Sequence, residues 1–231
     1  MSSGRVSGLA GAFGLSAAAI GLYATFGRRW LRRWGATEEE TWRPMPGDDL
    51  LPRTVYETTH AIDVDAPPHD VWPWLAQMGQ GRGGFYSYDW VERLGGLDIH
   101  SENRVIPEYQ HLAEGDIVRL APHTGLVVAV VEPPRVLVLR ATADMESKRP
   151  PAPTDPGYFD WSWAFVLKPV GASSSRLLIR LRADTAQALP FSVVGPVVWE
   201  PLHFLMERRM LRGIRERAER GEGKAAAVGV G

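Results

Sequence analysis

The chain has 231 residues, of which 45% are hydrophobic and 23% are charged, and its formal net charge at pH 7 is −1. This is the composition of an ordinary globular protein. A charge so near neutrality argues against nucleic acid as a partner, because such interfaces need an excess of basic side chains. Since the chain contains no cysteine, a disulfide framework, a thiolate zinc site and a cysteine nucleophile are excluded.

The chain begins with an apolar segment in which Val6–Gly27 carries no charge. Its 22 residues are enough for a helix to cross a hydrocarbon core of about 30 Å. Trp30 and Trp34, which suit a membrane interface, alternate with arginines. The arginines that follow the run are Arg28, Arg29, Arg32 and Arg33. Because positive charge favours the cytoplasmic side, we predict a single-pass membrane anchor over residues 1–34, with the globular domain in the cytoplasm.

Two other readings of this segment stay open. It could be a cleaved signal peptide, although a signal peptide usually has a compact apolar region, whereas this one is long and runs directly into Arg28 and Arg29. It could also be a helix that packs on the domain itself.

Residues 35–53 are acidic and then rich in proline and glycine, which predicts a linker. A β-branched, alternating stretch predicts a strand near Val55–Val64. The spacing of Val71, Trp74, Leu75 and Met78 predicts a helix that begins near Asp70 or is kinked at Pro73. A second short helix is expected over Tyr88–Leu94.

Five further strands are expected, in the segments 116–122, 125–133, 135–143, 161–169 and 176–184. In the last two, hydrophobic residues alternate with smaller or charged ones: Trp161, Trp163, Phe165 and Leu167 share one face, and Arg176, Arg180 and Arg182 share another. This alternation predicts a sheet with one buried face and one solvent-exposed face.

A long helix closes the chain, from Val197 or Pro201 to Arg220. Its apolar stripe is formed by Trp199, Leu202, Met206, Met210 and Ile214, and Glu207, Arg208, Arg212 and Arg215 are expected elsewhere around the helix. Residues 221–231 are expected to form a disordered tail. Strands grouped between helices predict an α+β domain over residues 54–220, in which a curved antiparallel sheet is covered by the long helix.

Three stretches carry a resemblance to a known family: AIDVDAPPHDVWPWLAQMGQGRGGFYSYDWVERLGG, IPEYQHLAEGDIVRL and VVEPPRVLVL. They resemble a largely bacterial branch of the START-like (SRPBCC) superfamily, which includes START lipid-binding domains and aromatic polyketide cyclases. The resemblance covers about Trp34 to Arg220. It implies a helix-grip fold with a hydrophobic cavity between the sheet and the last helix. Residues that would face this cavity are Trp199, His203, Met206 and Met210.

Polar and aromatic residues around the first helix are typical of a pocket that orients an apolar ligand. With the aromatic strand and the last helix, they make up the predicted ligand-binding set: Trp74, Gln77, Met78, Arg82, Tyr86, Tyr88, Trp161, Trp163, Phe165, Trp199, His203, Met206 and Met210. For Tyr86 and Tyr88 the alternative is a core position with a satisfied hydroxyl. For Arg82 the choice is between an anionic head group and a salt bridge that fixes its loop.

Other motifs are weak. Gly79–Gly84 matches G-x-G-x-x-G but follows a helix, whereas a dinucleotide fingerprint follows a strand. None of the six histidines has metal-ligand spacing, so neither a metal site nor a cofactor is predicted. No catalytic residue is assigned, although His203 is either an acid or base facing the cavity or a structural histidine.

Three functions compete. The first is a non-catalytic binding or carrier domain for a hydrophobic small molecule or lipid, working at a membrane. The second is an enzyme of polyketide cyclase or dehydrase type that uses Arg82, Tyr86, Tyr88 and His203. The third is a protein-interaction or regulatory module. The sequence does not indicate an oligomeric state.

Overall fold

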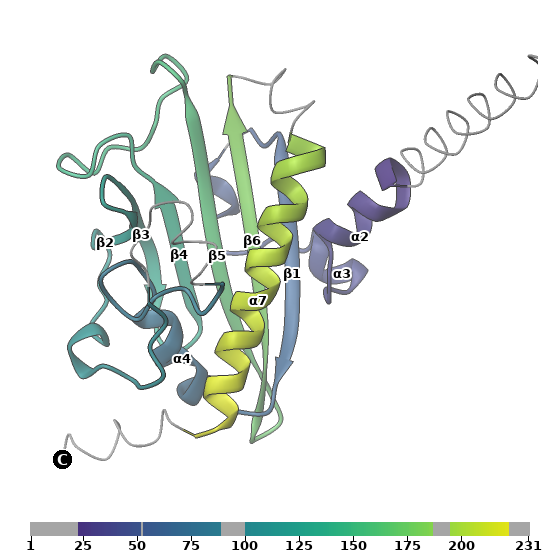
Figure 1. Ribbon diagram of the computed structural model, residues 1–231, viewed down its shortest axis with the longest axis vertical. Helices are drawn as coiled ribbons and strands as arrows, with labels where there is room; N and C mark the ends of the chain where they lie inside the picture. The colour runs from purple at the N-terminus through teal and green to yellow at the C-terminus, as the bar shows by residue number, and fades with distance from the viewer. Residues whose placement is uncertain (1–22, 52, 89–99, 187–194, 222–231) are drawn as a thin grey trace, which may run out of the picture.

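A computed structural model describes residues 23–51, 53–88, 100–186 and 195–221. Six antiparallel strands form one sheet in the order β1-β6-β5-β4-β3-β2, and a long helix, α7, lies across one face (Figure 1). The strands are β1 (Tyr56–Val64), β2 (Ile117–Ala121), β3 (Thr124–Glu132), β4 (Val136–Ala141), β5 (Phe159–Val170) and β6 (Ser174–Thr185). The helices that matter below are α2 (Arg28–Arg32), α3 (Glu38–Trp42), α4 (Pro68–Ala76) and α7 (Glu200–Glu219). The π-helical turns η1 (Tyr23–Gly27) and η4 (Gly195–Trp199) precede α2 and α7.

The predicted α+β order of strand, helix, strands and closing helix is confirmed. The helix predicted near Asp70 begins at Pro68 and contains Pro73. The expected helix over Tyr88–Leu94 and most of the expected C-terminal tail lie outside the described residues.

The inner face of the sheet packs against α7 and α4. Trp163 pairs with Leu181 across β5 and β6, and Phe165 pairs with Ile179, so the large apolar side chains of both strands face the same way. All four belong to the main hydrophobic core, together with Met210, Leu211 and Ile214 of α7. The helix comes close to the loop after α4, because a Cβ atom at Gly213 would lie 2.4 Å from the carbonyl oxygen of Tyr86. The prediction of an inner apolar face is confirmed.

The outer face, expected to be exposed to solvent, is partly covered. Residues 36–50, which belong to the expected linker, lie against it, and Ala36, Met45 and Leu50 pack on small clusters of buried side chains from β1, β4, β5 and β6. Arg180 of β6 is only 3% exposed and donates hydrogen bonds to backbone carbonyls of this segment. The prediction of a solvent-exposed outer face was wrong. Alternating hydrophobicity along a strand indicates which residues share a face, but only the tertiary structure places a distant segment over that face.

The predicted burial around the last helix needs a second correction. Glu207, expected outside the apolar stripe, is 3% exposed, whereas Leu202, expected within the stripe, is 43% exposed. The first half of α7 therefore turns a polar face toward the sheet. Buried charge is tolerated only where partners compensate for lost hydration, and the partners of Glu207 come from two strands.

The predicted anchor Val6–Gly27 lies largely outside the described residues. Within the described ranges, no helix combines the length and the hydropathy needed to cross a bilayer. The part of the anchor that is described, η1, continues directly into α2 beside the start of α7 (Figure 1).

Candidate functional site: a buried acid–base cluster

A cluster of ionisable side chains lies between the sheet and α7. His60 of β1 is fully buried, and its Nδ1 lies 2.5 Å from Oε2 of Glu207. Trp163 of β5 donates its indole N–H to the other carboxylate oxygen at 2.8 Å. Residues from three elements therefore converge on one buried carboxylate.

Strand periodicity explains why these groups meet. On β1 the side chains of Tyr56, Thr58 and His60 point alternately with those of Glu57 and Thr59, so the first three share the inner face. One turn along α7, His203 and Glu207 stand at i and i+4 and share one side of the helix. The structure brings these two polar sides together.

The protonation state of His60 follows from its two contacts. Its Nε2 lies 2.7 Å from the carbonyl oxygen of Leu31, which can only accept, so this nitrogen carries a hydrogen. Burial by itself lowers the pKa of His60, but the Glu207 carboxylate more than offsets this, and the net pKa lies above its ordinary value of 6.5. Burial by itself raises the pKa of Glu207, whereas the neighbouring imidazoles and the Trp163 N–H lower it to about 2. His60 and Glu207 therefore form a buried imidazolium–carboxylate pair.

His203 is the third ionisable side chain of the cluster, and it lies beside the ion pair of His60 and Glu207 without belonging to it. Its Nε2 is 3.9 Å from Glu207, and its ring stacks between those of Trp199 and His60, at centroid distances of 6.0 and 6.5 Å. Burial and the His60 charge lower the pKa of His203 despite the nearby carboxylate. Its Nδ1 is buried and has no hydrogen-bond partner among the described residues. This arrangement holds a neutral imidazole beside a fixed ion pair.

A second ion pair seals the outer end of the cluster. Glu200, the first residue of α7, is 2% exposed and accepts hydrogen bonds from Arg28 and Arg32 of α2, at 2.7 and 2.6 Å. Burial would raise the pKa of Glu200, but the two guanidinium groups lower it. Arg32 also lies over the ring of Tyr56, 4.9 Å from its centroid. These contacts fasten α2 to the start of α7.

The cluster predicts opposite titrations for its two histidines. Protonated His60 stabilises the folded protein fully at a pH below 6.5. This stabilisation is lost as the pH rises through the raised pKa of His60 in the folded protein. His203 has a lowered pKa, so its contribution is present above 6.5 and is lost as the pH falls. We expect nitrogen-15 spectra of the imidazoles to show His60 still protonated at a pH above 6.5 and His203 still neutral at a pH below 6.5. Titration of both histidines together at their ordinary value would contradict the assignment.

The predicted ligand-binding residues around α4 are packed within the fold, although the indole N–H of Trp74 is buried without a hydrogen-bond partner among the described residues. Trp74, Gln77 and Met78 are buried. The Gln77 amide donates to the carbonyl of Arg104 and accepts from the backbone N–H of Ile106, so it fastens the loop before β2.

Arg82 and the two tyrosines lie nearby. Arg82 donates to the carbonyl oxygens of Ala76 and Tyr109, at 2.9 and 3.0 Å, so it holds its loop through backbone acceptors. Tyr86 is 1% exposed and donates its hydroxyl to the carbonyl of Trp74 at 3.0 Å. Tyr88 is half-buried.

The aromatic residues of β5 form a continuous row on the inner face. The centroids of Trp161 and Trp163 are 6.1 Å apart, and those of Trp163 and Phe165 are 4.8 Å apart. Phe165 is fully buried, whereas Trp161 at the other end is only partly buried. The row therefore runs from the core toward the surface, and its middle member contacts the acid–base cluster.

The four predicted residues of the last helix occupy different environments. Met210 belongs to the core, Met206 is half-buried, and Trp199 is 42% exposed. Only His203 joins the acid–base cluster. Four residues of the cluster were not predicted from the sequence: His60, Glu207, Glu200 and Tyr56. The alternation of β1 and the i, i+4 spacing of His203 and Glu207 were the signals that could have indicated them. Among the described residues, no group of three histidine or acidic side chains is placed to hold a metal ion.

Comparison with known proteins gives matches in structure but not in sequence. No family model and no curated protein matches the chain. Similar solved structures include CalU16 from Micromonospora echinospora, with 19% identity and a TM-score of 0.34 over 76% of this chain and 92% of that one. The polyketide_cyc-like protein Cgl2372 from Corynebacterium glutamicum has 15% identity and a TM-score of 0.32, over 77% and 94%. A norcoclaurine synthase mutant from Thalictrum has 15% identity and a TM-score of 0.37, over 73% and 97%.

The architecture itself defines the fold. One antiparallel sheet with β1 beside β6, a helix between the first two strands and a long C-terminal helix across the inner face are present together. The chain has a helix-grip fold.

Proposed function

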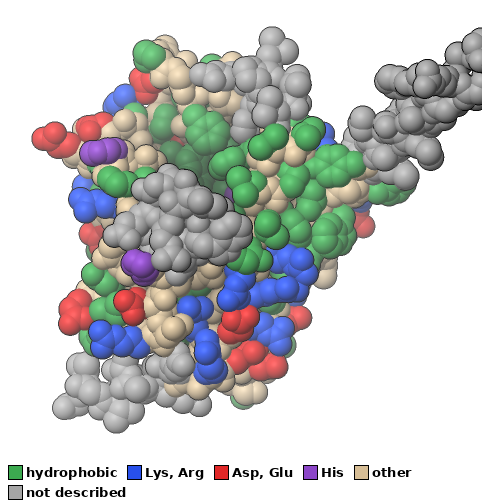
Figure 2. Space-filling view, viewed as in Figure 1, with side chains coloured by type: hydrophobic (Ala, Val, Ile, Leu, Met, Phe, Trp, Pro, Cys, Tyr) green, Lys and Arg blue, Asp and Glu red, His purple; other side chains and the backbone are tan. Residues whose placement is uncertain are grey.

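We propose that this chain is a membrane-tethered domain that binds or carries a hydrophobic small molecule or lipid between its sheet and α7. The observation that carries the proposal is the aromatic row of β5 beside the acid–base cluster. A large apolar surface with a few fixed polar atoms is the composition of small-molecule sites. Figure 2 supports it, with hydrophobic side chains in a hollow beside the start of α7.

His203 is proposed to form a hydrogen bond with the polar end of the ligand. Its Nδ1 is buried and finds no hydrogen-bond partner in the described part of the chain, and a ligand hydroxyl or carbonyl would supply one. The fixed pair of His60 and Glu207 holds the neighbouring charge constant, so the neutral His203 ring can donate or accept according to its tautomer. The tether rests on the uncharged run Val6–Gly27, and the cytoplasmic orientation rests on the arginines that follow it.

The test is a ligand extraction. The full chain is purified from membranes in a mild detergent, and the molecules that leave it on solvent extraction are identified by mass spectrometry. We expect one class of apolar compound in a fixed ratio to protein. A His203→Phe variant keeps an aromatic ring and should retain about tenfold less compound, the effect of one lost hydrogen bond of about 1.4 kcal/mol.

The matched control is His123→Phe, because His123 is exposed. This variant should retain the compound as the unaltered chain does. An extract without any enriched apolar compound would contradict the proposed function, and equal retention by both variants would contradict the role of His203.

A cyclase- or dehydrase-like enzyme is the second candidate, and the same imidazole favours it. A neutral histidine beside a buried ion pair can accept a proton from a substrate carbon or hydroxyl. Incubating the extracted compound with the chain and following its mass would reveal loss of water. A compound that returns unchanged from the chain supports carriage instead.

A further inference from the structure

We propose that the domain docks on the surface of an anionic phospholipid bilayer through one continuous face, formed by η1, α2, η4 and the first turns of α7. The inference rests on the proposed function to the extent that it takes Val6–Gly27 as the membrane anchor. Beyond the proposed function, the inference names the part of the folded domain that contacts the lipid.

This face exposes a large apolar surface. Seven of the large hydrophobic side chains exposed on the described part of the chain belong to these four elements: Phe26, Trp30, Val197, Val198, Trp199, Leu202 and Leu205. Their exposed fractions run from 42% to 72%. Figure 2 shows hydrophobic side chains gathered over this region, with a band of basic side chains along one border. Clustered apolar exposure of this kind marks an interaction surface.

The elements of this face are held together by contacts between side chains. Trp30 packs edge-on against Phe204 at a centroid distance of 5.3 Å. The hydroxyl of Tyr23 donates to the carbonyl of Pro196, and Glu200 binds Arg28 and Arg32. The apolar residues of α2 therefore keep a fixed position relative to those of α7.

The proposed anchor leads directly into this face. Tyr23 belongs both to the uncharged run and to the contact with Pro196. If the run crosses a bilayer, its last turn lies at the membrane boundary, and η4 lies there with it. Val197 and Val198 follow Pro196 directly, so the anchor places the exposed apolar residues at the depth where they meet lipid.

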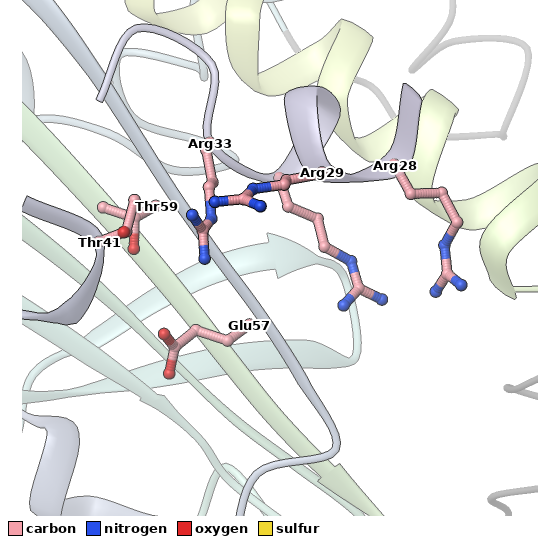
Figure 3. A pocket seen from close by; sticks show the side chains of 7 residues that line it. Arg28, Arg29, Arg33, Thr41, Glu57 and Thr59 are labelled. Atoms are coloured by element: carbon pink, nitrogen blue, oxygen red, sulfur yellow. The ribbon is translucent and has the colours of Figure 1, made fainter. Parts of the chain in front are cut away.

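Positive charge borders the apolar residues of this face. On α2, beside the apolar residues, a pocket of about 390 Å³ is lined by Arg28, Arg29, Arg32, Arg33, Thr41, Glu57 and Thr59. In Figure 3 the side chain of Arg29 extends from α2, and that of Arg33, the residue directly after α2, points toward Thr59 and Glu57. Glu200 balances one of the two charges of Arg28 and Arg32, and Arg182 pairs with Glu57, whereas Arg29 has a 3.5 Å contact with exposed Glu38.

Arg29 and Arg33, with the one charge of Arg28 and Arg32 that Glu200 leaves unbalanced, can therefore meet acidic lipid phosphates. Apolar and aromatic side chains bordered by arginine are the composition of a surface that lies in a membrane interface, buried about 5–10 Å. A protein partner would be satisfied by the apolar residues alone, whereas the joined anchor, apolar residues and arginines all fit one bilayer.

The test uses the full chain, which has no cysteine of its own, so single labels can be placed cleanly. Leu202→Cys and Val198→Cys variants carry an environment-sensitive fluorophore and are reconstituted into phosphatidylcholine vesicles with or without phosphatidylglycerol. A Ser173→Cys variant is the control, because Ser173 is exposed in the β5–β6 turn, at the far end of the sheet from the start of α7 (Figure 1). We expect spin-labelled lipid to quench the labels at 198 and 202 and to leave the label at 173 bright.

A variant without two of the arginines distinguishes the contribution of lipid phosphates to docking from that of the apolar side chains. In vesicles with phosphatidylglycerol, the double variant Arg29→Gln and Arg33→Gln should weaken docking about fivefold per arginine, the factor for about 1 kcal/mol at an anionic surface. Arg119→Gln with Arg135→Gln removes two exposed charges elsewhere and should have no such effect.

Each failure has a distinct signature. A chain that does not float with vesicles contradicts the anchor itself. A chain that floats but whose label at 202 is not quenched by lipid leaves the anchor standing and overturns the docking face. If the emission of the label is blue-shifted but spin-labelled lipid does not quench it, residues 1–22 cover the face. If that blue shift grows with protein concentration, a second copy of the chain covers the face. Either result overturns the proposal.

Discussion

Replacing Glu207 by glutamine is expected to lower the free energy of unfolding by about 3 kcal/mol, because the buried His60 imidazolium loses its counter-charge. Glutamine keeps the size of the side chain and can still accept the N–H of Trp163, so the substitution isolates the charge. Urea unfolding of the full chain in detergent, followed by tryptophan fluorescence, measures the change. The pKa of His60 should fall at the same time, because the carboxylate that raises it is gone.

Two variants keep this prediction open to failure. Glu216 binds Arg209 at 3.1 Å on the surface, so Glu216→Gln should change stability by less than about 0.5 kcal/mol. Replacing the buried pair with apolar residues, His60→Phe with Glu207→Met, should recover much of the loss, because neither charge is then left alone. If Glu207→Gln is as harmless as Glu216→Gln, the buried ion pair does not exist.

Replacing Arg180 by methionine is expected to lower the free energy of unfolding by about 3 kcal/mol and to loosen residues 37–50. The Arg180 guanidinium donates to the carbonyl oxygens of Glu40, Thr41 and Arg43 at 2.9–3.0 Å. It also pairs with Asp48 at 2.7 Å. Removing a buried charged donor leaves these acceptors without partners, a loss of several charge-assisted hydrogen bonds.

Hydrogen exchange distinguishes this effect from general destabilisation. Amides of residues 37–50 should exchange faster in Arg180→Met under conditions where those of β5 remain protected. The control is Arg135→Met, because Arg135 is exposed and its contact with Glu132 is 3.9 Å long. Unchanged exchange in residues 37–50 would show that Arg180 does not hold this segment to the sheet.

The acid–base cluster illustrates why part of a site escapes sequence reasoning. His203 could be chosen because it stands on an amphipathic helix that the fold places over the sheet. His60 could not be chosen in the same way, since its partner Glu207 is 147 residues away and each looks like a surface residue in isolation. The contact depends on how the helix is rotated on the sheet, and that rotation is decided by packing around Met210, Leu211 and Gly213.

The arginines of α2 illustrate a related point. Their sequence pattern, with tryptophans between them, predicts a membrane interface from composition. The structure shows that Arg28 and Arg32 also have a partner inside the fold, Glu200, which the pattern does not reveal. Arg29 and Arg33 remain for the role that the pattern suggests, so one helix divides its charge between the domain and the proposed bilayer.

The sequence by itself determined the order of strands and helices and the inner face of the sheet, because alternation and helical spacing are local consequences of burial. It also determined the length and flanking charge of the apolar run on which the anchor is predicted. Only the tertiary structure decided that residues 36–50 cover the outer face, that Glu207 is buried, and that α2 is fastened to α7. These depend on partners far apart in the chain, since a charge can enter the core only where distant groups compensate for its lost hydration.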